Sequence, residues 1–171
     1  MEGCNKCIKE FYWQLWFGDD KEPQDLDVCD TFTSPDVSIS ANDVKAFCAA
    51  VGNQQEKFKT VHTDEVKAPM DYAIITGRQA IMKSIFPSTI DGDLLQLVRP
   101  FNGSKLIPES RLLKAGNVYH TEAWVVAIVN SNSGKTVRAS GHVLCEENPV
   151  MRAQSAFFFR GRFTDYENTL R

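Results

Sequence analysis

The chain has 171 residues, of which 43% are hydrophobic, and this is enough for one domain with its own core. Its formal net charge is −3 and its Lys and Arg residues are scattered, which argues against the basic stripe that binds a nucleic-acid backbone. The sequence holds neither an apolar run of the roughly 18 residues that span a membrane nor a signal-peptide core. We therefore expect a cytoplasmic protein whose partners include neither nucleic acid nor a membrane.

The first predicted element is an amphipathic helix near the N-terminus that ends at Gly18. Its apolar positions repeat at helical spacing, and Trp13 and Phe17 lie at the edge of this face. The face consists of Ile8, Phe11, Tyr12, Leu15 and Trp16. Two interpretations stay open: the helix packs on the domain's own core, or it leaves an aromatic patch for a neighbouring domain or subunit. We assign residues 1–20 to this helix and residues 21–171 to the main domain.

The next predicted elements are a strand at Thr31–Ile39 and a short helix at Asn42–Val51. Ser40 and Asp43 have the spacing of a capping box, so they mark the start of this helix, and Gly52 ends it. The polar segment from residue 53 to residue 67 has no clear period. It predicts a long loop, and such loops often admit substrate.

A helix of about four turns is predicted at Asp71–Phe86, and Pro87 ends it. Apolar side chains cover most of its circumference, so we expect burial on nearly every side. The segments that follow it predict antiparallel strands, and the most direct way to bury such a helix is to curl the sheet around it. The predicted fold class is α+β: a single hot-dog fold, with an antiparallel sheet wrapped around one long apolar helix and an extra N-terminal amphipathic helix.

Turn signals separate the strands of this sheet, and the inner face of one strand is made of small residues. We expect that small face to let the sheet approach the helix closely. The predicted strands begin with Leu94–Val98, after a turn at Asp91-Gly92, and continue with Val118–Asn130, Lys135–Cys145 and, after a turn at Glu147-Asn148-Pro149, Val150–Arg160.

The cysteines and histidines give no strong indication of a metal or cofactor. Cys4 and Cys7 form a CxxC, which could be redox-active or half of a zinc site, but the sequence offers no second pair to complete it. The histidines, His62, His120 and His142, are widely spaced, and we interpret them as surface or strand residues. We expect free thiols, no metal and no cofactor.

Four long segments closely resemble the dehydratase region of the beta subunit of fungal type I fatty acid synthase. They are FYWQLWFGDD, APMDYAIITGRQAIMKSIFPSTIDGDLLQLVRPFNGSKLI, AGNVYHTEAWVVAIVNSNSGKTVRASGHVL and SAFFFRGRFTDYENTLR. They occur in order and span nearly the whole chain. The resemblance is to the hot-dog module that precedes the MaoC-like catalytic hot-dog. It implies a role in fatty acid biosynthesis, in a multienzyme complex that removes water from 3-hydroxyacyl groups held on an acyl carrier protein.

The resemblance also implies that this half lacks the acid and base of the reaction. Catalytic relatives carry an Asp and a His in a G-D-x-N-P-x-H pattern, but the matching positions here are Asn53 and Phe58, and neither can shuttle a proton. Catalytic relatives also direct backbone N–H groups of the central helix at the thioester carbonyl. Here Pro69 has no N–H, and the Asp71 carboxylate would occupy the positive helix end. We therefore expect no catalytic residue in this chain.

The resemblance implies a supporting half that lines the acyl tunnel beside an adjacent MaoC-like hot-dog module and other synthase domains. Candidate lining residues are Met70, Asp71, Ile74 and Gly77, although Gly77 could equally pack against the thin strand and Asp71 could merely stabilise the helix. Two alternatives stay open. The chain could be a free-standing acyl-binding or scaffold hot-dog, or an active hydratase or thioesterase with a non-standard acid and base. The candidates for such a pair are His62, Asp64, Glu65 and Asp71. A homodimer of the isolated chain is a further hypothesis.

Overall fold

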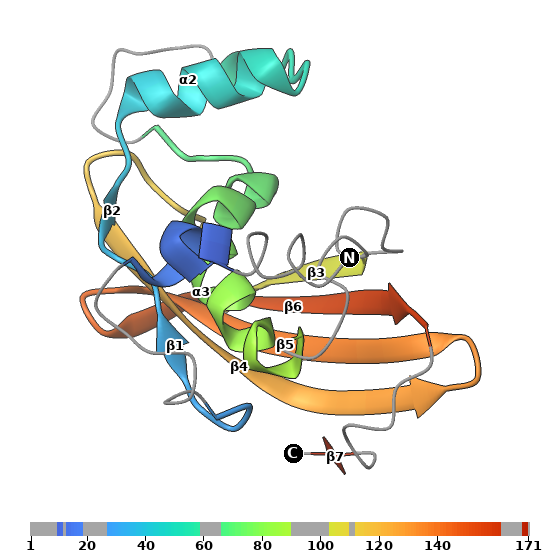
Figure 1. Cartoon of the computed structure of the whole chain (residues 1–171). Helices are drawn as coiled ribbons and strands as arrows, with labels where there is room; N and C mark the ends of the chain where they lie inside the picture. The colour runs from blue at the N-terminus through green and yellow to red at the C-terminus, as the bar shows by residue number, and fades with distance from the viewer. Residues whose placement is uncertain are drawn as a thin grey trace.

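Three long antiparallel strands form the centre of the sheet in this computed structural model (Figure 1). They are β4 (Val118–Ser131), β5 (Gly134–Cys145) and β6 (Asn148–Arg160). The shorter strands are β1 (Phe32–Thr33), β2 (Val37–Ser38), β3 (Gly103–Pro108) and β7 (Thr169–Leu170). The strand order is β1-β4-β5-β6-β3, and the short strands β2 and β7 also pair with β4. The structure describes residues 10–11, 13–18, 27–58, 66–89, 103–109, 112–161 and 169–170.

The sheet lies against one long helix, α3 (Ala73–Ile85), as the sequence predicted (Figure 1). A 3-10 turn, Met70–Tyr72, precedes α3, and another, Pro87–Thr89, follows it. The prediction of burial on nearly every side is wrong, because Ile74 and Ile75 are 48% and 52% exposed. The buried face of α3 is built mostly of small side chains: Ala73, Thr76, Gly77, Ala80, Ile81, Ser84 and Ile85.

Residues 10–11 and 13–17 are helical, and Gly18, with φ of +70°, follows them. The predicted inward face is wrong in part: Phe11 and Leu15 are 61% and 51% exposed, whereas Trp13 and Phe17 turn inward. The rings of Trp13 and Phe17 lie 5.6 and 5.5 Å from the ring of Phe86, just after α3. Contacts with Phe86 therefore fix the orientation of this helical segment, and part of its aromatic surface packs on the domain's own core.

Helix α2 (Ala41–Ala50) begins at the predicted capping box. The backbone N–H of Asp43 donates to Ser40 Oγ at 3.1 Å, and the backbone N–H of Ser40 donates to Asp43 Oδ2 at 2.9 Å. The hydrogen bonds from the Ser40 side chain and backbone lower the pKa of Asp43. The predicted Thr31–Ile39 strand is instead divided into β1 and β2, because Pro35 has no N–H and Ser34 Oγ accepts the N–H of Thr121 at 2.9 Å.

The two hairpins confirm the predicted strands but shift one turn. The β5–β6 turn lies at Glu146 and Glu147, with φ of 50° and 62°, rather than at residues 147–149. Positive φ at both central residues is the geometry that matches strand twist in a two-residue hairpin. Strand β6 therefore begins at Asn148, two residues earlier than predicted, and Pro149 is accommodated beside a register shift in β5.

The predicted inward face of β5 is confirmed, with Val137, Ala139, Gly141, Val143 and Cys145 all buried, but the alternation is incomplete because Ser140 on the other face is buried as well. However, the small size of Gly141 serves β4 rather than the helix. A Cβ on Gly141 would lie 2.6 Å from the backbone oxygen of Glu122. The sequence also missed Lys135, which is fully buried on this face and donates from Nζ to the Ser88 carbonyl at 2.5 Å.

Several predictions fall on residues outside those the structure describes. They are the CxxC of Cys4 and Cys7, the candidate pair members His62, Asp64 and Glu65, and the turn and strand between residues 91 and 98. The division at residue 20 also stays a prediction. Among the described residues, no helix is long and apolar enough to cross a membrane.

Candidate functional site

The residues around the start of α3 form the candidate site. Pro69 precedes the 3-10 turn in an extended conformation, and Met70 and Asp71 lie on that turn with exposed side chains. The next turn adds Ile74 and Ile75, which are also exposed. The 3-10 turn and the first turn of α3 therefore bring three predicted residues together: Met70, Asp71 and Ile74.

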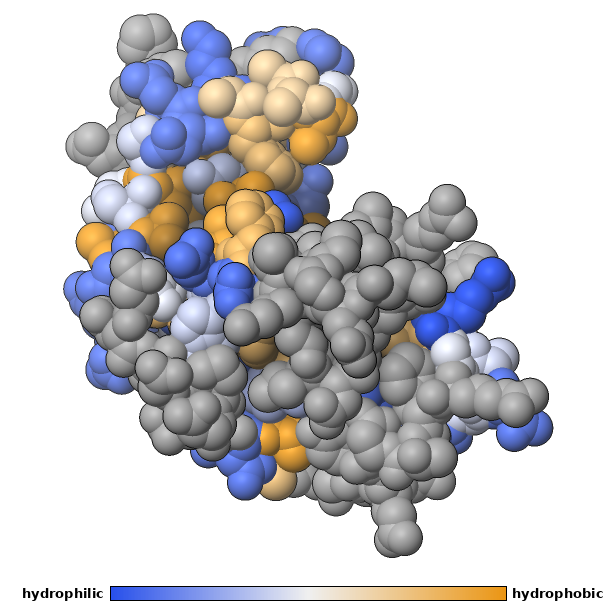
Figure 2. Space-filling view, in the orientation of Figure 1, coloured by the Kyte–Doolittle hydropathy of each residue, from blue (hydrophilic) through white to orange (hydrophobic). Residues whose placement is uncertain are grey.

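Met70, Ile74 and Ile75, which we call the α3 apolar face, leave a large hydrophobic area open to solvent. Figure 2 shows apolar surface gathered in this region, from the end of α2 down towards the start of α3. Their exposed fractions of 39%, 48% and 52% are high for such side chains. Large contiguous apolar surface is a common feature of binding surfaces, so the α3 apolar face is the candidate site.

Gly77 lies apart from the α3 apolar face, because its Cα faces β4. A Cβ at this position would meet Thr121 Cγ2 at 3.7 Å, which is an ordinary van der Waals contact. The hydroxyl of Thr121 donates to the Thr76 carbonyl at 3.3 Å in the same contact. Gly77 thus packs against a strand, which was one of its two predicted roles. The strand is β4, however, and not β5, the strand with the small inward-facing residues. The role of Gly77 as a lining residue stays a prediction.

Asn53 and Phe58 have structural surroundings that the sequence did not reveal. The N–H of Asn53 donates to the Cys48 carbonyl at 2.8 Å, and Asn53 Oδ1 accepts the N–H of Gln55 at 3.1 Å. Asn53 thereby satisfies the end of α2 and shapes the next turn. Phe58 lies in a 3-10 turn, Glu56–Phe58, and is 5% exposed in the core cluster that also contains Val44.

Burial and nearby carboxylates raise the pKa values of two groups beside the start of α3, Cys48 and Tyr72. Burial raises the pKa of the Cys48 thiol, and the charge of Asp71 raises it further. Burial also raises the pKa of Tyr72, with a smaller contribution from Asp43. Both neighbours of the α3 start therefore stay neutral near pH 7, and neither is prepared to act as a nucleophile or base.

Two histidines lie in strands, as predicted, and away from the start of α3. His120 Nδ1 is 3.9 Å from Asp36 Oδ1, in a cavity of about 610 Å³ at the β4–β5 end of the sheet. His142 Nε2 is 3.8 Å from Glu109 Oε1, and its ring meets Trp124 edge-on at 5.3 Å. Within the described part of the chain, no three His, Cys, Asp or Glu side chains are grouped so that they could hold a metal ion.

Comparison with known proteins agrees with this architecture. Solved structures that the chain resembles include the 3R-hydroxyacyl-ACP dehydratase complex HadBC of Mycobacterium tuberculosis. It has a TM-score of 0.62 and 13% identity, and the match covers 78% of this chain and 98% of that one. Another is the MaoC-like dehydratase of Phytophthora capsici, with a TM-score of 0.64 and 16% identity over 83% of this chain and 50% of that one. These likenesses confirm the hot-dog fold.

Sequence comparison gives closer relatives. The chain is 43% identical to the fatty acid synthase subunit beta of Schizosaccharomyces pombe and 44% identical to that of Saccharomyces cerevisiae, each over 169 residues. These matches cover 99% of this chain but only 8% of each relative. Residues 38–161 match the family model for the MFE-2 hydratase 2 N-terminal domain. The chain thus belongs to the MFE-2 hydratase 2 N-terminal domain family. Fungal fatty acid synthase beta subunits are relatives, and they match this chain over nearly its whole length.

Proposed function

We propose that the chain is the supporting, acyl-tunnel-forming hot-dog half of a 3-hydroxyacyl-[acyl carrier protein] dehydratase module in a fungal-type fatty acid synthase. In this role it acts in fatty acid biosynthesis beside a MaoC-like hot-dog that carries the acid and base. The chain itself contributes no catalytic residue. Its partners are that adjacent module, other synthase domains and the acyl chain held on the carrier protein, in the cytoplasm. The similarity to fungal synthase beta subunits supports this assignment.

The observation that carries the proposal is the burial of Phe58. This residue takes the place where the catalytic pattern has its histidine, and here its ring is part of the hydrophobic core with Val44 and Cys48. Asn53, at the position of the catalytic aspartate, is held by backbone hydrogen bonds at the end of α2. A phenyl ring and a carboxamide exchange no protons near pH 7, so both positions contribute structure instead of acid–base chemistry.

The α3 apolar face supports the tunnel role. About half of the surface of Ile74 and of Ile75 is open, and covering it would stabilise a complex by roughly 2 kcal/mol for each side chain. An acyl chain or the facing hot-dog would supply that cover. Asp71 sits beside this face with an exposed carboxylate, which suits a solvent-facing mouth better than a dry tunnel interior.

Hydration of a crotonyl thioester tests the proposal. The purified chain alone should give no turnover, and a mixture with the MaoC-like module that follows it in a fungal synthase should be active. Ile74→Asp should abolish the gain from mixing, because it places a charge on the face to be covered. Val118→Asp is the matched control, since Val118 is 49% exposed on β4 and lines the cavity that contains His120, which includes no residue of the α3 apolar face.

Other outcomes separate the alternatives. Turnover by the chain alone that Asp71→Ala removes would reject the proposal in favour of an active hydratase with a non-standard acid and base. Tight binding of a fatty acyl thioester by the chain alone, with no gain on mixing, would instead identify a free-standing acyl-binding hot-dog. In either case the Phe58 argument would be wrong or insufficient.

A further inference from the structure

The face of the sheet that points away from α3 carries a groove that the proposed function does not use. It crosses β3, β6, β5 and β4 and has a volume of about 510 Å³. We call it the outer groove. Its lining residues are Lys105, Val126, Arg138, Ala139, Gln154, Ser155 and Ala156.

The strand register explains why these side chains meet. Lys105 on β3 pairs with Gln154 on β6, and Arg138 on β5 pairs with Ala156, two residues further along β6. Side chains at paired positions, and at alternate positions of one strand, share a face of the sheet. The polar ends of Lys105, Gln154 and Arg138 therefore rise from one surface, and the small side chain of Ala156 leaves the space between them open.

A β-bulge in β4 borders the groove. The register between β4 and β5 shifts between Val125 and Ala127, so Val126 is the extra residue. Bulges bend a strand and redirect a side chain, and they are frequent beside binding sites. Here the bulged residue itself lines the groove.

The groove is positively charged in a chain whose formal net charge is −3. None of the described lining residues is acidic, and within the described part of the chain neither Lys105 nor Arg138 takes part in an ion pair. The adjacent cation on β6, Arg152, is different, because its Nε lies 3.6 Å from Glu109 Oε1. Two exposed cations thus remain available for an anionic partner.

We infer that the outer groove binds an acidic polypeptide segment in the polyproline II conformation, with carboxylates three residues apart. Lys105 and Arg138 stand on strands that flank β6 and are offset by two residues along it, so their backbones are about 12 Å apart, and their long side chains can converge on a shorter spacing. Polyproline II has three residues per turn and rises about 3.1 Å per residue, so side chains three residues apart lie on one side at about 9 Å spacing. Arg138 can take one carboxylate in bidentate fashion and Lys105 the next, while Gln154 can donate to the backbone between them.

The probe is the synthetic peptide Asp-Pro-Pro-Glu-Pro-Pro-Asp, titrated into the full ¹⁵N-labelled chain at low salt. Backbone signals of residues 138 and 154–156 and the Gln154 side-chain amide should shift, and binding should weaken as salt rises. Lys105→Glu with Arg138→Glu should weaken binding at least tenfold, because two attractions become repulsions. The peptide Lys-Pro-Pro-Lys should then bind this double variant better than it binds the original chain.

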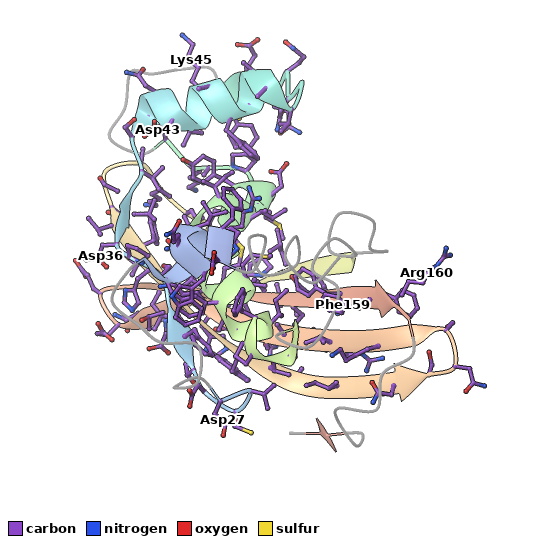
Figure 3. The ribbon with its side chains drawn as sticks, in the orientation of Figure 1. Asp27, Asp36, Asp43, Lys45, Phe159 and Arg160 are labelled. Carbon is purple, nitrogen blue, oxygen red and sulfur yellow. The ribbon has the colours of Figure 1, made fainter. Side chains whose placement is uncertain are left out.

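The matched control is Lys45→Glu with Arg160→Glu, which makes the same charge change on α2 and at the far end of β6 (Figure 3). It should alter peptide affinity less than twofold. Equal weakening by the control pair, or equal binding of a peptide with adjacent carboxylates, would overturn the inference. So would shifts that map outside the outer groove, or inorganic phosphate reproducing the same shifts at the same concentration. This test involves no acyl substrate, so its result is independent of the proposed dehydratase role.

Discussion

Two glycines of the core should respond in opposite directions to the same substitution. Gly141 on β5 pairs with Ala123 on β4, and a Cβ on Gly141 would lie 2.6 Å from the Glu122 backbone oxygen and 3.2 Å from Ala123 Cβ. A backbone oxygen cannot rotate away, so the two strands must separate by several tenths of an ångström. Overpacking of this kind costs about 1–3 kcal/mol. Gly141→Ala should therefore lower the free energy of unfolding by that amount.

Gly77→Ala is the matched substitution with the opposite sign. The nearest neighbour of a Cβ on Gly77 is Thr121 Cγ2 at 3.7 Å, so the site accepts a methyl group without displacement. Alanine is favoured over glycine in a helix interior by about 1 kcal/mol. The added methyl group should thus raise the free energy of unfolding by about that value.

Urea denaturation followed by circular dichroism measures both effects. With a slope of about 2 kcal/mol per molar urea, the midpoint should fall by about 0.5–1.5 M for Gly141→Ala and rise by about 0.5 M for Gly77→Ala. Refutation would be a Gly141→Ala chain as stable as the original, or a Gly77→Ala chain that is less stable. A stabilised Gly77→Ala chain that nonetheless fails to activate the MaoC-like module would support a tunnel role for Gly77.

Three further changes test separate parts of the fold. Ser40→Ala should lower the free energy of unfolding by about 1 kcal/mol, because it removes the N-cap of α2. The pKa of Asp43 is lowered in the folded chain, so its carboxylate stabilises the fold above pH 3.8 and this stabilisation is lost as the pH falls. Denaturation measured at several pH values should therefore show that the stability of the Ser40→Ala variant depends less on acid pH. Trp16→Ala, at 9% exposure, should cost about 3 kcal/mol in the same assay, whereas Leu15→Ala, at 51%, should change stability by less than about 0.5 kcal/mol. Lys135→Met should cost about 1–3 kcal/mol, because the buried carbonyl just past α3 loses its charged donor; a neutral or stabilising result in thermal melts would contradict the importance of that hydrogen bond.

The elements that depend on local sequence could be predicted, and those that depend on distant contacts could not. The capping box at Ser40 and Asp43 needs only residues three apart, and the long strands need only alternation. The orientation of the N-terminal helix depends instead on Phe86, because the rings of Trp13 and Phe17 pack against its ring. An aromatic run offers several faces of similar hydrophobicity, so its periodicity alone does not choose between them.

The candidate site divides in the same way. The turn at Met70 and the exposed first turn of α3 follow from one short segment, which is why sequence reasoning brought Met70, Asp71 and Ile74 together. The exposure of Ile74 could not be predicted, because it depends on how much of α3 the sheet covers. Lys135 was not predicted to be buried because a lysine breaks the apolar alternation; in the fold its Nζ donates to the Ser88 carbonyl. The outer groove could not be predicted, because its residues are brought together by the pairing of several strands, and a local sequence pattern does not show which residues pair.

Placing a histidine at residue 58 tests the proposal that Phe58 has a structural role at the position where catalytic hot-dogs have a histidine. The Phe58 ring is 5% exposed among core residues that include Val44, Cys48 and Tyr72, none of which carries a charge to stabilise an imidazolium. Phe58→His should therefore lower the free energy of unfolding by about 2–4 kcal/mol. The loss should be larger below about pH 6, because the histidine of the unfolded chain binds a proton there and the buried histidine of the folded chain does not. Phe11→His, at 61% exposure, should have little effect. The chain should gain no hydratase activity, even with Asn53→Asp added, because the position faces the core and not the α3 apolar face. Measurable turnover by the stable double variant would show that residue 58 still reaches substrate, and that loss of the acid–base pair alone separates this half from its catalytic relatives.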